Sequence, residues 1–171
     1  MKKVLVAVDD TRAAESVVSV FDNLVRPPEE VILLHVERLE GRSRMIDMLG
    51  EAELSTLREQ LRGTEYKEAL DKKAESILSH YKKRFDNGGL VKVTTMIREG
   101  IPSEEISKVA QEENVELIIV GCDRQEGLNK FIFGCVSEQV ERDSGVPVIV
   151  AKETPEHKAA GLREAGIITA A

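Results

Sequence analysis

Short apolar runs and longer amphipathic stretches alternate along this chain. An apolar run of a few residues is typical of a strand buried on both faces of a sheet. Such runs are found at residues 4–8, 31–36, 117–120 and 148–150. The stretches between them carry apolar residues three and four positions apart, which is the spacing of one helix face. The pattern therefore predicts strands and helices in turn, as in an α/β protein.

Two of the predicted helices have well-defined apolar stripes. The stripe of the first helix comprises Ala14, Val17, Val18, Phe21 and Leu24. A second, longer stripe comprises Tyr66, Ala69, Leu70, Ala74, Ile77, Leu78 and Tyr81. Pro27 and Pro28 end the first helix, because proline interrupts helical hydrogen bonding. We expect both stripes to face the core.

One further strand has a different pattern. Its residues Val91, Val93 and Ile97 alternate with Lys92, Thr94 and Met96. This alternation predicts an edge strand with one exposed face. Five strands alternating with helices then predict a doubly wound, Rossmann-like parallel sheet with the strand order 3-2-1-4-5. In such a sheet ligands bind outside the carboxyl ends of the strands where the strand order reverses, here between the first and fourth strands.

Two segments lie outside this alternation. Residues 37–64 form a charged insertion in which Leu54, Leu57 and Leu61 fit a helical stripe. The insertion either packs against the domain or acts as a lid over the carboxyl edge of the sheet. Residues 153–171 form a tail that is either loose or docks its apolar end on a partner subunit. The domain itself is expected at residues 1–152.

The composition narrows the function classes. With 171 residues and 42% apolar content, the chain can bury one sizeable core. A formal net charge of −7 argues against nucleic acid as a partner, because phosphate backbones need clustered Lys and Arg. Two cysteines provide no disulfide framework. Because no apolar run approaches ~18 residues and Met1 leads into a strand, we expect a cytoplasmic protein without a membrane span or signal peptide.

The strongest candidate site follows the fourth predicted strand. A loop begins at Gly121, and Gly134 precedes a predicted helix over residues 135–144, which Gly145 ends. A helix N-terminus offers free backbone N–H groups and the positive end of the helix dipole. This order of strand, glycine-bearing loop and helix predicts a phosphate-binding site.

The residues of this loop carry a resemblance to a known family. The pattern Gly121-x2-Arg124-x9-Gly134-Cys135 resembles the nucleotide loop of the universal stress protein family. The ATP-binding branch of that family carries Gly-x2-Gly-x9-Gly-Ser/Thr at this place. This chain keeps the first and last glycines, whereas Arg124 replaces the middle glycine and Cys135 replaces the hydroxyl residue.

The resemblance implies a set of site residues. Ala7 and Asp9 would lie near the base and ribose of an adenine nucleotide, and the backbone of Val36 near the adenine edge. The phosphates would be surrounded by Gly121, Gly134, Cys135 and Val136. ATP is the implied ligand, with Mg²⁺ only as its companion. For Asp9, the residue type alone also fits a helix cap at a strand end.

The two departures from the motif leave alternatives open. The Arg124 guanidinium either pairs with a phosphate, fills the pocket or extends into solvent. A thiol at Cys135 is a weaker donor than a hydroxyl, but a helix N-terminus lowers its pKa. With Cys122 on the same loop, Cys135 could form a thiol redox switch, or both cysteines could be small buried hydrophobic residues.

The resemblance implies a regulatory stress-response module that binds ATP or another adenine nucleotide, with slow hydrolysis at most. No residue looks like a dedicated catalytic base. The resemblance also implies a homodimer through the last strand, residues 146–151, which would otherwise be an exposed sheet edge. The alternatives are a dimeric interaction or signalling protein without a nucleotide, and the thiol switch.

Overall fold

A computed structural model of the chain describes residues 1–10, 12–37, 51–86, 89–122 and 136–152. Within these ranges the strands are β1 (Lys3–Ala7), β2 (Glu30–Glu37), β3 (Lys92–Glu99), β4 (Leu117–Cys122) and β5 (Val148–Lys152). The helices are α1 (Arg12–Leu24), α2 (Glu51–Leu61), α3 (Glu65–Phe85), α4 (Pro102–Glu112) and α6 (Val136–Asp143). Strands and helices therefore alternate as the sequence predicts, with α2 added before α3.

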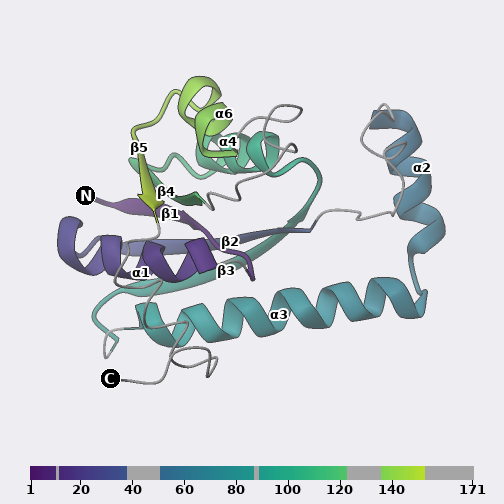
Figure 1. Ribbon diagram of the computed structural model, residues 1–171, viewed down its shortest axis with the longest axis horizontal. Helices are drawn as coiled ribbons and strands as arrows, with labels where there is room; N and C mark the ends of the chain where they lie inside the picture. Colours follow the sequence, from purple (N-terminus) through teal and green to yellow (C-terminus); the bar gives the residue numbers. More distant parts are fainter. Residues whose placement is uncertain (11, 38–50, 87–88, 123–135, 153–171) are drawn as a thin grey trace, which may run out of the picture.

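The strands form one parallel sheet with the order β3-β2-β1-β4-β5 (Figure 1). This order confirms the predicted doubly wound topology. The central strand, β1, pairs with β2 on one side and with β4 on the other, and Ala7 stands opposite both Leu34 and Val120. The order reverses between β1 and β4, so their carboxyl ends frame the crevice in which such sheets bind ligands.

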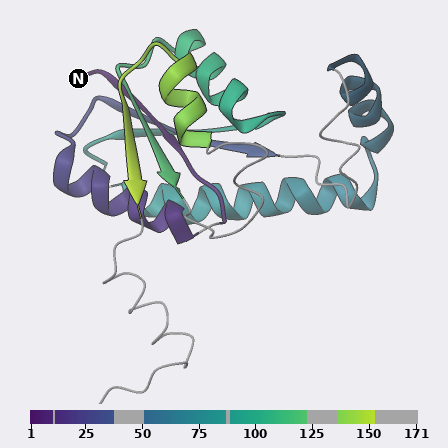
Figure 2. The ribbon, with the colours of Figure 1, turned by 45° about the horizontal axis from the view of Figure 1, so that its top comes forward.

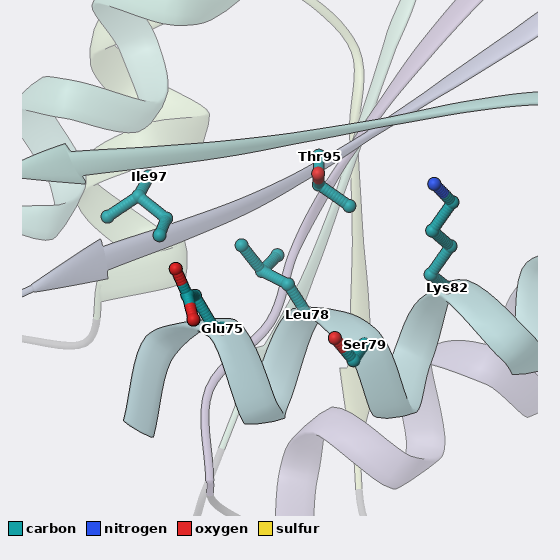
Figure 3. Close-up of a pocket in the computed structure, with 6 residues that line it drawn as sticks. All are labelled: Glu75, Leu78, Ser79, Lys82, Thr95 and Ile97. Atoms are coloured by element: carbon teal, nitrogen blue, oxygen red, sulfur yellow. The ribbon is translucent and has the colours of Figure 1, made fainter. Parts of the chain in front are cut away.

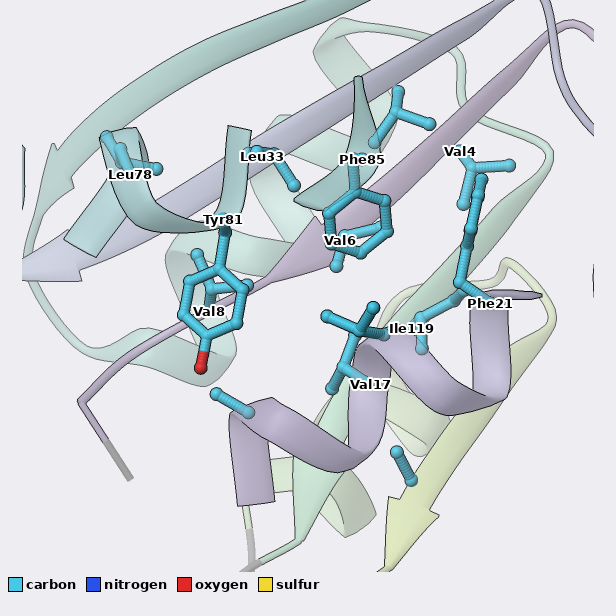
Figure 4. Packing of buried hydrophobic residues seen from close by; sticks show 14 of the residues in the cluster. Val4, Val6, Val8, Val17, Phe21, Leu33, Leu78, Tyr81, Phe85 and Ile119 are labelled. Atoms are coloured by element: carbon cyan, nitrogen blue, oxygen red, sulfur yellow. The ribbon is translucent and has the colours of Figure 1, made fainter. Parts of the chain in front are cut away.

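Helices cover both faces of the sheet (Figures 1 and 2). On one face, α1 and α3 pack over a core that includes Val6, Leu33 and Ile119 (Figure 4). The rings of Phe21 and Phe85 meet edge to face there, with centroids 4.9 Å apart. On the other face, α4 and α6 pack over a second core that includes Leu5, Ile32, Leu34, Ile118 and Val120. Because side chains alternate along a strand, each strand contributes to both cores.

Two helix stripes extend beyond the core that they were predicted to face. Leu24, at the end of α1, is 69% exposed, and Tyr66, in the first turn of α3, is 42% exposed. Burial on α3 begins at Ala74 and continues to Phe85. A 21-residue helix is roughly 32 Å long, whereas an eight-residue strand spans about 26 Å. The amino-terminal part of α3 therefore projects past the sheet towards α2 (Figure 1).

The alternation predicted for β3 is wrong at its carboxyl end. Met96 packs against the core under α4 and α6, whereas Ile97 is 37% exposed. The reason is that β3 is an edge strand with helices near both faces, so neither face is simply buried or simply exposed. The prediction that β3 lies at a sheet edge is confirmed.

The other local predictions concern α6 and α2. Val136 and Val140 of α6 both face the second core, and Gly145 ends the helix with a φ of +66°, a conformation that glycine adopts without strain. The helix α2 lies where Leu57 and Leu61 predicted one, beyond the sheet at the far end of α3 (Figure 2). The lid role of residues 37–64 stays a prediction.

Candidate functional site

The candidate site lies at the carboxyl ends of β1 and β4. Ala7 is the last residue of β1, and Asp9 follows it with an exposed side chain. Gly121 stands one residue beyond Val120, the register partner of Ala7. The two strand ends are thus neighbours in space although the sequence separates them by more than half the chain.

Three of the predicted site residues gather on one face of the sheet. Ala7, Val36 and Val136 are all half-buried, and all pack against the core under α4 and α6. They come from β1, β2 and α6, so the fold brings these three elements together on this face. Met96 of β3 packs against the same core. Sequence reasoning missed Met96 because the alternation assigned it to the outer face.

Most of the other half of the predicted site belongs to the segment between β4 and α6. Arg124, Gly134 and Cys135 lie outside the described residues, so their roles stay predictions. Cys122 is half-buried at the end of β4, and its register partner on β5 is Lys152. The thiol-switch hypothesis stays a prediction for the same reason.

Next to Val36, a side-chain hydrogen bond follows the main-chain hydrogen bonds that join β1 and β2. The Val8 N–H donates to Leu34 O at 2.9 Å, which continues the ladder one bond beyond β1. The Val8 carbonyl oxygen lies 2.9 Å from Nδ1 of His35. Because a carbonyl only accepts, Nδ1 carries the hydrogen and donates it. His35 therefore has a hydrogen-bond partner on the segment that follows β1.

The loop after β1 is tied to α3 by charge. Nζ of Lys73 lies 2.6 Å from Oδ2 of Asp10. The hydrogen bond from Lys73 is the largest cause that holds the pKa of Asp10 below its ordinary value, and the nearby charge of Lys73 adds to it. Asp10 therefore remains an anion at neutral pH beside the exposed Asp9.

A second charge cluster joins α3 to the carboxyl ends of β2 and β3. Nζ of Lys67 lies 2.5 Å from Glu37, 2.5 Å from Asp71 and 2.6 Å from Glu99. Burial alone would lower the pKa of Lys67, but the hydrogen bonds that its ammonium group donates to the three carboxylates raise the pKa above its ordinary value. Sequence reasoning missed this cluster because its members are spread over three elements in a chain rich in charge.

A hollow of about 470 Å³ lies elsewhere, between α3 and the outer edge of β3 (Figure 3). It is lined by Glu75, Leu78, Ser79, Lys82, Thr95 and Ile97. None of the predicted site residues is in this lining. The carboxyl ends of β1 and β4 therefore remain the candidate site, because the reversal of strand order and the predicted residues coincide there.

Neither a metal-binding cluster nor a membrane-spanning helix is found among the described residues. No group of three or more His, Cys, Asp or Glu side chains in that part of the chain is arranged to hold a metal ion. Within the same part, no helix is long and apolar enough to cross a membrane.

Known proteins resemble this chain over most of its length. The family model described as the universal stress protein family matches residues 1–152. Universal stress protein MJ0577 from Methanocaldococcus jannaschii is 36% identical over 157 residues, which cover 88% of this chain and 94% of that protein. The solved structure of MJ0577 has a TM-score of 0.66 at 32% identity and covers 90% of this chain and 96% of that one.

More distant structures share the fold. A universal stress protein solved in complex with cAMP has a TM-score of 0.58 at 14% identity, covering 90% of this chain and 98% of that one. A family member from Arabidopsis thaliana, solved with AMP bound, has a TM-score of 0.59 at 18% identity, covering 91% and 94%. With its motif residues, its strand order and these matches, the chain belongs to the universal stress protein family.

Proposed function

We propose that this protein is a regulatory stress-response module that binds an adenine nucleotide, ATP in the first instance, in the crevice between β1 and β4. The observation that carries the proposal is the gathering of Ala7, Val36 and Val136 on one face at the topological switch point. The predicted phosphate loop joins β4 to α6, and both elements contribute to this face.

The adenine half of the proposed site rests on the main chain of Val36. In a parallel sheet, each residue of a strand points its N–H and its C=O to the same neighbouring strand. Successive residues alternate between the two neighbouring strands. Glu37 O accepts from Gly100 N–H on the β3 side, so the N–H and C=O of Val36 point to the β1 side. An N–H beside a C=O complements the ring nitrogen and amino group on the edge of adenine. Apolar side chains at Ala7 and Met96 suit the flat faces of the base.

The ribose and phosphate half follows the resemblance. The Asp9 carboxylate would accept a hydrogen bond from a ribose hydroxyl. Backbone N–H groups at the start of α6, with the helix dipole, would favour the phosphates. The guanidinium of Arg124 would add a bidentate contact to a phosphate oxygen pair. Mg²⁺ would enter with the nucleotide, bound mainly by phosphate oxygens.

The class of ligand also has support from relatives. The proteins solved with cAMP and with AMP carry adenine nucleotides on the same fold. The proposed role is regulatory, with slow hydrolysis at most, and the cytoplasm stays the predicted location.

We also propose a homodimer through the last strand, residues 146–151. The strand β5 is at an edge of the sheet, and its residues Val148, Ile149 and Val150 are only half-buried. An edge strand with unpaired main-chain groups and apolar side chains is a ready surface for pairing with a second copy.

Calorimetric titration with ATP and Mg²⁺, and then with AMP and cAMP, tests the nucleotide proposal. Binding should also raise the melting temperature, because a ligand of the native state stabilises it. Asp9→Asn should weaken binding about tenfold, as the loss of a charged hydrogen bond does. Asp22→Asn, at an exposed position of α1, is the matched control. No heat and a flat melting curve at millimolar ATP would favour the dimeric interaction protein instead.

A further inference from the structure

The β1–β2 ladder ends beside the proposed adenine position, one bond beyond the last residue of β1 and before the end of β2. Its last bond is from Val8 N–H to Leu34 O. In a regular parallel ladder the next bond would run from Val36 N–H to Val8 O. In this structure that carbonyl bonds to the His35 ring instead, and no bond from Val36 N–H to Val8 O is formed.

The side of the sheet from which His35 reaches this carbonyl matters. Leu33, two residues earlier on β2, packs in the core under α1 and α3, so His35 points to that same face. A regular ladder bond lies in the plane of the sheet. A hydrogen bond from a side chain on one face instead favours a carbonyl that is turned towards that face, and so away from the Val36 amide.

The residues that follow β1, here called the exit of β1, are held at a second point on the face covered by α1 and α3. Asp10, two residues after Val8, pairs with Lys73 of α3 at 2.6 Å. Both contacts act on the stretch that carries Asp9, and both come from the side opposite to the core that Ala7 and Val36 contact. The exit of β1 is therefore fixed from one face while the candidate site lies on the other.

We propose that His35 is a positioning residue of the nucleotide site. Its hydrogen bond to Val8 O stops the ladder early and keeps the N–H and C=O of Val36 available to the edge of an adenine base. This inference rests on the proposed nucleotide binding. It adds a residue that touches no nucleotide itself and acts through the main chain of its neighbours.

The wild-type protein offers a first test that needs no ligand. Amide hydrogen exchange followed by NMR should be much faster at Val36 than at Leu34 and Glu37, whose amides lie in the ladders to β1 and β3. Slow exchange at Val36, equal to that of its neighbours, would overturn the inference.

Two substitutions at His35 extend the test. His35→Leu removes the donor, so Val36 N–H should bond to Val8 O and its exchange should slow about 2- to 13-fold, the factor of one net hydrogen bond. The affinity for ATP should fall by a similar factor, since that bond must open for the base to bind. His35→Asn places an amide donor near the position of Nδ1 and should restore both values. His80→Leu, on the exposed side of α3, controls for the loss of a histidine.

The outcomes separate the inference from the function on which it rests. A merely structural role for His35 predicts lower stability with faster exchange at Val36 in His35→Leu, and that result would overturn the inference. If the wild-type protein binds no ATP by calorimetry, the proposed function fails, and the exchange rate at Val36 still decides whether His35 holds the ladder open.

Discussion

Replacing Lys67 by methionine removes the cation shared by Glu37, Asp71 and Glu99. Glu37 is 5% exposed, and its second oxygen, Oε1, is buried without a hydrogen-bond partner among the described residues. Loss of Lys67 thus leaves a buried carboxylate with neither cation nor donor. Breaking a buried ion pair from one side costs ~3–5 kcal/mol. Because Asp71 and Glu99 are partly exposed and contribute little, we expect about 3 kcal/mol.

This loss corresponds to a melting temperature lower by roughly 6–12 °C for a chain of this size. Urea unfolding and calorimetry both measure it. Lys72→Met, at an exposed position of α3, should cost less than about 0.5 kcal/mol. Combining Lys67→Met with Glu37→Leu should recover most of the stability, because the orphaned charge is gone. Equal losses in Lys67→Met and Lys72→Met would refute this account of the cluster.

Further predictions concern the core, the acid limb of stability and the dimer. Phe85→Ala should cost ~3–5 kcal/mol in urea unfolding, because Phe85 is 2% exposed and packs against Phe21, whereas Leu24→Ala should cost under about 0.5 kcal/mol. Hydrogen bonds from Lys92 and then Thr94 hold the pKa of Glu30 below its ordinary value of 4.5. The stabilisation that the Glu30 carboxylate provides is therefore present above that pH and is lost as the pH falls. In Glu30→Gln, the free energy of unfolding should fall less steeply towards acid pH. Val150→Pro should convert the proposed homodimer to a monomer in light scattering. Because Pro147 O faces β4, the Val150 N–H faces the open edge of the sheet, and proline removes this donor. A dimer that persists would exclude pairing through β5.

The topology could be predicted because it depends on local patterns. Buried strands of a parallel sheet are short apolar runs, and each crossover helix carries its own stripe. Gly145 marked the end of α6 for an equally local reason, since its positive φ favours glycine. These signals need no knowledge of which elements meet in space.

The residues whose burial was predicted wrongly show the limit of local sequence patterns. Leu24 and Tyr66 continue helical stripes correctly, but the sheet is too short to cover the ends of the helices. A stripe gives the direction of a side chain and not the extent of the surface opposite it. Ile97 was misassigned because α3 does not pack closely on this edge strand, and the hollow between them leaves Ile97 37% exposed.

The electrostatic and ladder features of the site needed the structure. Lys67 meets Glu37 and Glu99 only because α3 crosses the ends of β2 and β3. The bond from His35 to Val8 O depends on where the β1–β2 ladder ends, which no periodicity encodes. By contrast, Ala7, Val36 and Val136 came from a family resemblance and meet on one face of the sheet.

A titration of isotope-labelled protein with ATP and Mg²⁺, followed by NMR, tests the central claim most directly. We expect the backbone signals of Ala7, Asp9, Val36 and Val136 to shift together with one saturating dissociation constant. Signals of Leu78 and Thr95, at the hollow between α3 and β3, should stay unchanged. Shifts that centre on that hollow, or an unchanged spectrum at millimolar ATP, would contradict a nucleotide site between β1 and β4.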